Sequence, residues 1–449
     1  MTEGRGSDRK TKLTLPDGLS RRGFLETVGG LGAVGSLMVI MPSALRAQEA
    51  GEAGEPVKVG VMGPFTGPAS RTGDDVRKGV EMALEGARAA GETPVTIDGS
   101  KRDIEIVWVD SQSSPEKAVK AVTDAVNRRG VQFMVNGWHS SVAMAVMDAE
   151  VPLKIVHIGH QGASQYVSEK INKDPEKYKG WFKGWPSPPI FAGLYGEPLR
   201  HFMDNGLWTP ATKTAAVLVE DTDYGRGWGE ALMNSLKQAG FDPLPYDVTA
   251  LDETEFSPLI AKYKALRVSV VGITTTGSVS AANFVKQFRS QRVKALVIGH
   301  GLTWFSEWYE LTGDASDFVV TMDSPRIMAP FQQAWVDRYE AKYGEEPGIA
   351  PSGHAYDYMR LAIEVLNQAG TLDFDTLVET TREIEYEGVW QYYKFSKEPG
   401  PNALAPNEVM TGRFMEGFFL PMVQLKKGEA KIVWPLKYAQ QEFEQPPWI

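Results

Sequence analysis

The sequence predicts an α/β protein with two doubly wound, Rossmann-like lobes and a ligand cleft between them. Short apolar runs alternate with amphipathic helical patterns, as in repeated βαβ units. This alternation is interrupted once, by a segment rich in Trp, Pro and Lys, and then starts again. With 449 residues the chain also exceeds one compact core, so two domains of ordinary size are expected.

The first strand and the loop that follows it organise the first lobe. Residues 57–62 are apolar at nearly every position, as expected for a strand that is covered on both faces. The loop 63–73 holds small residues, hydroxyls and one cation, and the next helix is predicted to begin at Asp74. Open α/β sheets bind ligands at the carboxyl ends of their strands. The side chains expected to face a ligand in this loop are Ser70, Arg71 and Thr72.

The first series continues with three predicted strands, at residues 104–109, 131–135 and 154–159. After the first of these, Ser114 is the expected N-cap of a helix that has Pro115 at its first position and ends at Gly130. Right-handed crossovers make a doubly wound sheet the simplest arrangement. Gln165–Tyr195 is predicted to be a loop insertion that ends in the crossing to the second lobe.

A second series of similar plan follows. Strands are predicted at residues 214–220, 245–249, 268–274, 294–299 and 318–322. Helices are predicted at residues 227–239, from 258, and at 280–289, 331–343, 355–368 and 374–382. The aromatic and proline-rich tail indicates short strands, such as residues 418–425.

Composition excludes several classes of partner and site. The formal charge is −10, and because residues 1–47 carry seven basic and four acidic side chains, the remaining chain has a charge of −13. This acidity argues against nucleic acid and anionic lipid as partners. The chain contains no cysteine. That removes disulfides, thiolate metal sites, thiol nucleophiles and lipid attachment through an amino-terminal cysteine.

The amino terminus predicts export. Ser20-Arg21-Arg22-Gly23-Phe24-Leu25 precedes a modest apolar stretch and then small residues up to Ala47, an order that resembles a twin-arginine signal. Residues 1–47 are therefore expected to be a signal peptide and residues 48–55 a flexible tail. No later window is long and apolar enough to span a bilayer. We expect a soluble periplasmic protein without a lipid anchor.

No catalytic residues, cofactor or metal site are expected. The sequence lacks a Walker loop, H-E-x-x-H, G-x-S-x-G and a strand followed by G-x-G-x-x-G. The acidic cluster of Glu220, Asp221 and Asp223 fits a helix start better than an acid/base pair. On a strand, the spacing of His157 and His160 places their side chains on opposite faces, which argues against a shared metal ion.

Six segments carry a family resemblance, and in order they read GPFTGPASRTGDD, NGWHSSVAMAV, KIVHIGHQGAS, VEDTDYGRGWGEAL, EFSPLIAKYK and VIGHGL. In this order and spacing they resemble the leucine/isoleucine/valine-type solute-binding proteins of ABC importers, over about residues 57–434. The resemblance implies a type I periplasmic binding protein whose lobes, joined by three crossings, hinge shut on a small-molecule solute. It implies ABC permease subunits as partners, and we expect a monomer. The implied boundaries are 56–185 plus 325–390 for lobe 1, and 186–324 plus 391–449 for lobe 2.

The resemblance also implies where the ligand binds. In lobe 1 the expected contacts follow the third and fourth strands, at Trp138, His139, Ser140, Ser141, His160, Gln161, Ala163 and Ser164. In lobe 2 the tyrosine of the family's D-x-x-Y-G turn corresponds to Tyr224. Two further loops of lobe 2 supply Thr275, Thr276, Ser278, His300 and Gly301.

The sequence departs from the family where amino-acid binders pair a carboxylate with the ligand ammonium, because Gly301 stands near that place. Burying an ammonium without a counter-charge costs several kcal/mol. We therefore expect a small organic acid, aromatic or branched, before an amino acid or amide. Arg71, hydroxyls and helix amino ends would bind its carboxylate, and Trp138 and Tyr224 would flank its body.

Two functions from other classes stay open. Twin-arginine export often carries cofactor enzymes, so an exported oxidoreductase is one alternative, and colour or bound metal in the purified protein would favour it. A ligand-sensing partner of a receptor is the other. It shares the fold and differs in what docks on its outer faces.

Overall fold

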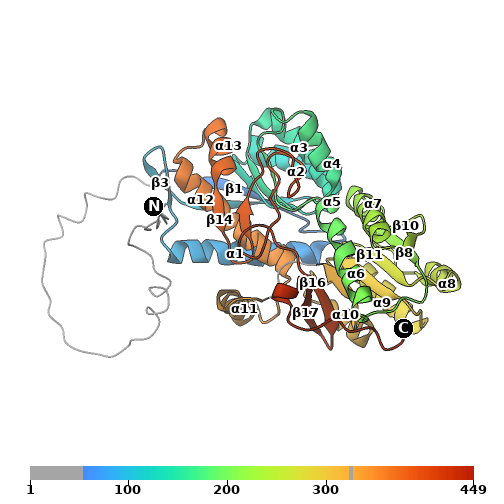
Figure 1. The fold of residues 1–449 in the computed structure, drawn as a ribbon. Helices are drawn as coiled ribbons and strands as arrows, with labels where there is room; N and C mark the ends of the chain where they lie inside the picture. The colour runs from blue at the N-terminus through green and yellow to red at the C-terminus, as the bar shows by residue number, and fades with distance from the viewer. Residues whose placement is uncertain (1–53, 323–326) are drawn as a thin grey trace, which may run out of the picture. The chain divides into compact units, whose positions relative to one another are not determined.

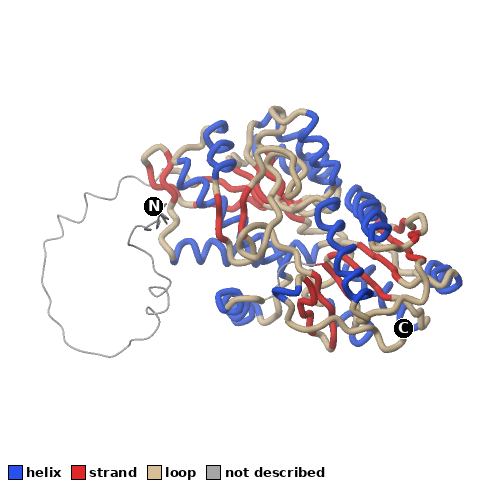
Figure 2. The backbone as a smooth tube through the Cα atoms, viewed as in Figure 1, coloured by secondary structure: helices blue, strands red, loops and turns tan. Residues whose placement is uncertain are grey.

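The computed structural model describes residues 54–322 and 327–449 (Figure 1). The predicted signal peptide, 1–47, and all but the last two residues of the predicted tail, 48–55, lie outside the described residues. Helices and strands alternate along most of the described chain, as Figure 2 shows by colour. The predicted α/β class is confirmed by two sheets whose main strands are parallel.

The first sheet has five parallel strands in the order β4-β1-β5-β6-β7. These strands are β1 (Val57–Gly63), β4 (Ile104–Asp110), β5 (Phe133–Val135), β6 (His157–His160) and β7 (Trp181–Lys183). Val59 of β1 pairs with Ile106 on one side and Phe133 on the other, so β1 is central. The order reverses direction between β1 and β5. Such a switch point is where doubly wound sheets bind ligands.

Helices cover both faces of this sheet. On one face, α1 (Ser70–Ala89) packs beside α12 (His354–Ala369), and their apolar side chains join one core cluster with β1. On the other face, α2 (Pro115–Asn127) packs on α3 (Ser140–Glu150) in a separate cluster. The N-cap Ser114 accepts a hydrogen bond from the Lys117 N–H, which confirms the predicted start of α2.

Two predictions in this half are wrong. Helix α1 begins at Ser70 rather than Asp74, so the end of the expected ligand loop is already helical. Gln165–Tyr195 is not a plain loop, because it contains α4 (Gln165–Lys173), the edge strand β7, α5 (Pro188–Phe191) and a 3-10 turn. Ser164 caps α4 by accepting from the Tyr166 N–H, and the helix buries Val167 and Ile171. The tryptophans, lysines and prolines in this segment obscured these short elements.

The second sheet has the order β10-β8-β11-β12-β13-β16-β17, and β9 also pairs with β8. Its parallel strands are β8 (Thr214–Glu220), β9 (Asp242–Pro243), β10 (Asp247–Thr249), β11 (Val270–Thr274), β12 (Leu296–His300) and β13 (Val320–Met322). The antiparallel strands β16 (Met422–Lys426) and β17 (Glu429–Trp434) extend its edge. The order reverses between β8 and β11, which creates a second switch point.

The helices of this half are α6 (Gly196–Asp204), α7 (Asp223–Gln238), α8 (Ser257–Ala265), α9 (Ser278–Ser290) and the short α10 (Trp308–Thr312). Helix α7 begins at Asp223 and not near Gly227 as predicted. The reason is local: the Thr222 hydroxyl accepts from the Gly225 N–H and caps the helix earlier. Tyr224 therefore lies in the first turn of α7, beside the carboxyl end of β8.

Segments that are distant in sequence complete the first half. After β13, α11 (Pro330–Tyr343) contacts α1, and Tyr339 donates a hydrogen bond to Asp75. Near the carboxyl terminus, the Lys183 N–H of β7 donates to the Asn407 carbonyl. Further elements are α13 (Phe374–Glu383) and two small antiparallel pairs, β2 (Val95–Ile97) with β3 (Ser100–Arg102) and β14 (Glu385–Glu387) with β15 (Tyr392–Lys394).

Candidate functional site

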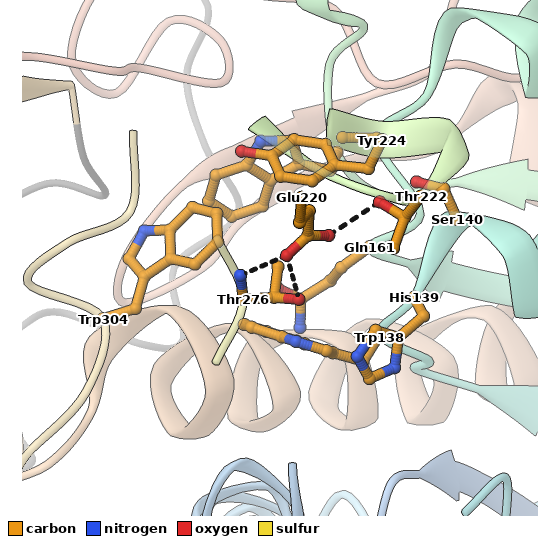
Figure 3. A pocket seen from close by; sticks show the side chains of 11 residues that line it. Trp138, His139, Ser140, Gln161, Glu220, Thr222, Tyr224, Thr276 and Trp304 are labelled. Carbon is orange, nitrogen blue, oxygen red and sulfur yellow. Dashed lines mark hydrogen bonds between the residues drawn. The ribbon is translucent and has the colours of Figure 1, made fainter. Parts of the chain in front are cut away.

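A pocket lies where the carboxyl ends of strands from both sheets meet (Figure 3). Its cavity has a volume of about 30 Å³. The first half contributes residues that follow β5, β6 and β7, and the second half contributes residues at or after the ends of β8, β11 and β12. The lining residues are Trp138, His139, Ser140, Gln161, Ala163, Trp185, Glu220, Thr222, Tyr224, Thr276 and Trp304.

Hydrogen bonds fix the orientation of Gln161 in the first wall. Asn136 donates its Nδ2 to the Met62 carbonyl, 3.0 Å away, which leaves Asn136 Oδ1 as an acceptor. Gln161 Nε2 donates to that oxygen at 3.0 Å. Gln161 Oε1 is then buried without a hydrogen-bond partner among the described residues. The wall thus presents Gln161 Oε1 as an unpaired acceptor, and the ring nitrogens of His139 in the same wall are also buried without partners in the described part of the chain.

Glu220, the last residue of β8, is 1% exposed in the opposite wall. Its carboxylate accepts hydrogen bonds from the Thr276 N–H at 2.5 Å, the Thr276 hydroxyl at 2.9 Å and the Thr222 hydroxyl at 2.7 Å. Burial raises the pKa of Glu220 above its ordinary value, and the threonine donors oppose this shift because they favour the ionised form. Figure 3 shows these bonds at the middle of the site.

Two side chains that do not line the pocket fix the position of Tyr224. Its hydroxyl lies 2.7 Å from Thr274 Oγ1 and 2.5 Å from His300 Nδ1. His300 in turn stacks on Phe191, with ring centroids 4.2 Å apart. The tyrosine ring is therefore fixed by contacts at the ends of β11 and β12, and His300 supports it without lining the pocket.

Three tryptophans meet at nearly right angles around the pocket. The ring centroids of Trp138 and Trp304 are 5.5 Å apart at 78°, and those of Trp185 and Trp304 are 5.3 Å apart at 75°. Trp304 can fold into the site because Gly301 has φ +71° and no side chain. A Cβ at Gly301 would lie 2.5 Å from the Trp304 ring. The indole thus lies against Gly301, near the place where the family resemblance led us to look for a carboxylate.

Burial disfavours the charged form of three histidines near the pocket, His139, His160 and His300. Burial lowers the pKa of His139 to about 4 and that of His300 to about 3. Burial also lowers the pKa of His160 well below its usual range. Glu220 is consequently the one lining side chain, among the described residues, that carries a formal charge in its ionised form.

Seven of the predicted contacts line the pocket: Trp138, His139, Ser140, Gln161, Ala163, Tyr224 and Thr276. The structure does not bring the other ten into its lining: Ser70, Arg71, Thr72, Ser141, His160, Ser164, Thr275, Ser278, His300 and Gly301. Arg71 instead donates to Glu345 Oε2 and Ser306 Oγ, both at 2.9 Å. Ser164 caps α4, and its N–H donates to Ser140 Oγ.

Sequence reasoning missed four lining residues: Trp185, Glu220, Thr222 and Trp304. Glu220 and Thr222 stand at the end of a predicted strand, where ligand sites are expected, but Glu220 was interpreted as part of a helix start. Trp185 and Trp304 lie in irregular segments. Their residue type alone does not distinguish a cavity wall from a core contact.

Within residues 54–322 and 327–449, no group of His, Asp and Glu side chains could hold a metal ion. The rings of His157 and His160 nevertheless lie 5.5 Å apart, so the prediction that they occupy opposite faces is wrong. The cause is Gly159, whose φ of +80° disturbs the alternation of β6. In the same part of the chain, no helix combines the length and apolarity needed to cross a bilayer.

Comparisons of the sequence with known proteins all point to one family. A family model described as periplasmic binding protein matches residues 56–410. The leucine-, isoleucine-, valine-, threonine- and alanine-binding protein of Pseudomonas aeruginosa is 24% identical over 336 residues, which cover 75% of this chain and 84% of that protein. The relatives in this family are binding proteins and not enzymes.

Solved structures share the fold. A putative branched-chain amino acid ABC transporter protein from Silicibacter pomeroyi superposes with a TM-score of 0.74 at 20% identity, covering 88% of this chain and 100% of that chain. A solute-binding protein of an ABC transporter from Rhodopseudomonas palustris, in complex with 3,4-dihydroxy benzoic acid, has a TM-score of 0.68 at 19% identity. It covers 87% of this chain and 99% of that chain.

Proposed function

The chain belongs to the periplasmic binding protein family, and from this membership we propose that it is the extracytoplasmic solute-binding component of an ABC importer. It binds a small organic solute and delivers it unaltered to the membrane subunits of a permease. The observation that carries this proposal is the pocket, because residues from the strand ends of both sheets line it. The predicted twin-arginine signal supports a site of action in the periplasm.

We take each sheet with its helices as one lobe, and closure of the two lobes as the binding step. Trp138 of the first lobe touches Trp304 of the second inside the pocket, and Arg71 of the first lobe donates a hydrogen bond to Ser306 of the second. These contacts form only when the lobes are together. A solute that contacts both walls therefore shifts the open and closed populations toward the closed form, whose outer surface the permease recognises.

Relatives support a small organic molecule as the solute. The Pseudomonas aeruginosa relative is named for aliphatic amino acids and threonine, and the Rhodopseudomonas palustris neighbour contains an aromatic acid. The preference for a carboxylate was based on the missing acidic residue near Gly301 and on Arg71, hydroxyls and helix amino ends. Arg71 does not line the pocket, whereas the acidic Glu220 does. Aromatic walls remain available for the apolar body of a solute.

The test is a thermal-shift screen of aliphatic amino acids, benzoate, dihydroxybenzoate, amides and amines, followed by small-angle scattering. A solute at a hundred times its Kd should stabilise the protein by about 2.7 kcal/mol. Tyr224→Ala should abolish this response, whereas the control Tyr309→Ala, at an exposed tyrosine outside the pocket, should keep it. Identical scattering with and without every solute that binds, or release of a chemically altered solute, would contradict the proposal.

A further inference from the structure

The charge in the pocket is negative and uncompensated. Glu220 receives three hydrogen bonds from threonine groups, yet no Lys or Arg nitrogen of the described residues pairs with its carboxylate. Burial raises the pKa of Glu220, and the threonine hydrogen bonds oppose this shift because they favour the ionised form. A positive charge beside the carboxylate would favour the ionised form further. Since its oxygen atoms already have donors, what Glu220 lacks is a positive charge nearby and not another hydrogen bond.

Aromatic faces surround this anion. Trp138, Trp185, Trp304 and Tyr224 all line the same cavity, and the three indoles meet edge to face. The face of an aromatic ring is the negative end of its quadrupole, and a desolvated cation over such a face is attracted electrostatically. Aromatic rings together with a carboxylate therefore favour an organic cation over a neutral molecule of equal shape.

Besides the Glu220 carboxylate and the aromatic rings, Gln161 contributes an acceptor oxygen to the pocket. Its amide is oriented by the chain of bonds from Met62 through Asn136, so that the unpaired Oε1 is left over on a side chain that is 6% exposed and lines the pocket. A buried acceptor without a donor is costly. A cation, or an N–H group on one, satisfies it.

The N–H groups of Trp138, Trp185 and Trp304 are buried without hydrogen-bond partners and could donate to an anion, but the described lining offers an anion no positive charge. His139 lines the pocket but burial keeps it neutral, and its pKa lies at about 4. Arg71, the cation that the sequence analysis expected at the site, forms ion pairs with Glu345 and Glu307 and does not line the pocket. A carboxylate in this cavity would therefore meet Glu220 without a compensating charge.

We propose that the solute carries a compact alkylammonium group, which the indoles of Trp138, Trp185 and Trp304 enclose and the Glu220 carboxylate neutralises. The proposal rests on the proposed solute-binding function and specifies its chemical class.

The experiment compares cations with neutral molecules of similar shape. Thermal shift and calorimetric titration of the full mature chain would use tetramethylammonium, trimethylammonium and choline. Tert-butanol and 3,3-dimethylbutan-1-ol are the neutral counterparts, and leucine and benzoate represent the family's other solutes. We expect the cations to bind and the neutral counterparts to bind at least about tenfold more weakly.

Two variants separate charge from fold. Glu220→Gln should weaken cation binding by about tenfold or more, whereas Asp221→Asn, at the exposed neighbour that pairs with Arg226, should leave it within about twofold. If Glu220→Gln lowers the melting temperature of the free protein, Trp304→Leu provides the second readout, because loss of an aromatic face weakens cations more than their neutral counterparts.

The outcomes of these binding experiments distinguish this inference from the proposed function. Binding of leucine or benzoate with no response to any cation would overturn this inference and leave the proposed function intact. Equal affinity for cations and their neutral counterparts, or cation affinity unchanged in both variants, would also overturn it. If no solute of any class changes the melting temperature or the scattering profile, the proposed function itself fails.

Discussion

Lys183 Nζ lies 3.1 Å from Glu408 Oε1 in the interior of the protein, with both side chains at most 1% exposed. The same ammonium donates to the Trp185 carbonyl at 2.8 Å and to the Ser187 hydroxyl at 2.7 Å. The Ser187 N–H donates to Glu408 Oε1. The ion pair therefore anchors the backbone that presents Trp185 to the pocket.

Removing one partner of this buried pair should be strongly destabilising. Lys183→Met leaves the Glu408 carboxylate buried without its cation, so we expect a loss of about 3 kcal/mol in the free energy of unfolding, measured in urea. The double variant Lys183→Met with Glu408→Leu should recover part of that loss. As a control, Lys120→Met removes the exposed pair with Glu116 and should not change the melting temperature.

Asp75 should make stability depend on pH. Burial raises the pKa of Asp75 to about 7, against the partial opposition of Arg71, Lys78 and the Tyr339 hydroxyl. Because the folded state holds this proton more tightly than the unfolded state, the stabilisation is complete below about pH 4 and is lost as the pH rises through about 7.

The variant Asp75→Asn should lack this dependence. The free energy of unfolding of the wild type should rise by on the order of 2 kcal/mol when the pH is lowered from about 8 to about 5. That of Asp75→Asn should not show this rise. Urea titrations at both pH values measure this. Asp74→Asn, at the exposed neighbour on α1, is the control, and a pH slope that Asp75→Asn leaves unchanged would refute the prediction.

Gly301→Ala should damage the pocket more than an equivalent change elsewhere. Gly301 and Gly344 have nearly the same φ, +71° and +73°, but a Cβ at Gly344 meets nothing within 4 Å, whereas one at Gly301 meets the Trp304 ring. Gly344→Ala should therefore cost about 1 kcal/mol for backbone strain, and Gly301→Ala about 3 kcal/mol. Only the Gly301 variant should also lose solute affinity, as calorimetry would show.

Arg71→Ala should favour the open arrangement. Arg71, on α1, reaches Ser306 and Glu307 in the loop after β12, so it links the two halves. Its side chain is 39% exposed, and the link is accordingly weak. We expect about a twofold loss of solute affinity and a larger radius of gyration in scattering of the free protein. Arg88→Ala, at the exposed end of α1, should show neither change.

The regular parts of the fold could be predicted because their signals are local. Ser114 and Pro115 mark the start of α2, and the apolar run from Val57 marks β1, as the structure confirms. The segment 165–195 could not be interpreted in this way. Its elements are held by tertiary contacts, such as the Lys183 to Glu408 pair, and Glu408 is more than two hundred residues away.

The pocket was predictable in position but not in composition. Strand ends after β5, β6, β8 and β11 were expected to face the ligand, and residues from each line the cavity. Arg71 was placed there because its loop follows β1, yet the early start of α1 directs it to Glu345. Trp304 depends on the positive φ of Gly301, which the sequence does not reveal.

The backbone bonds from Lys183 to Asn407 and Val409 have a consequence for solubility. Strand β7 forms one border of the first sheet, and an unprotected border is a template on which another molecule can add a strand. The carboxyl-terminal segment covers this border within the same chain. A protein cut before residue 400 would retain the residues of all five strands but lose this cover and Glu408, the partner of Lys183, and it should aggregate through strand addition between copies.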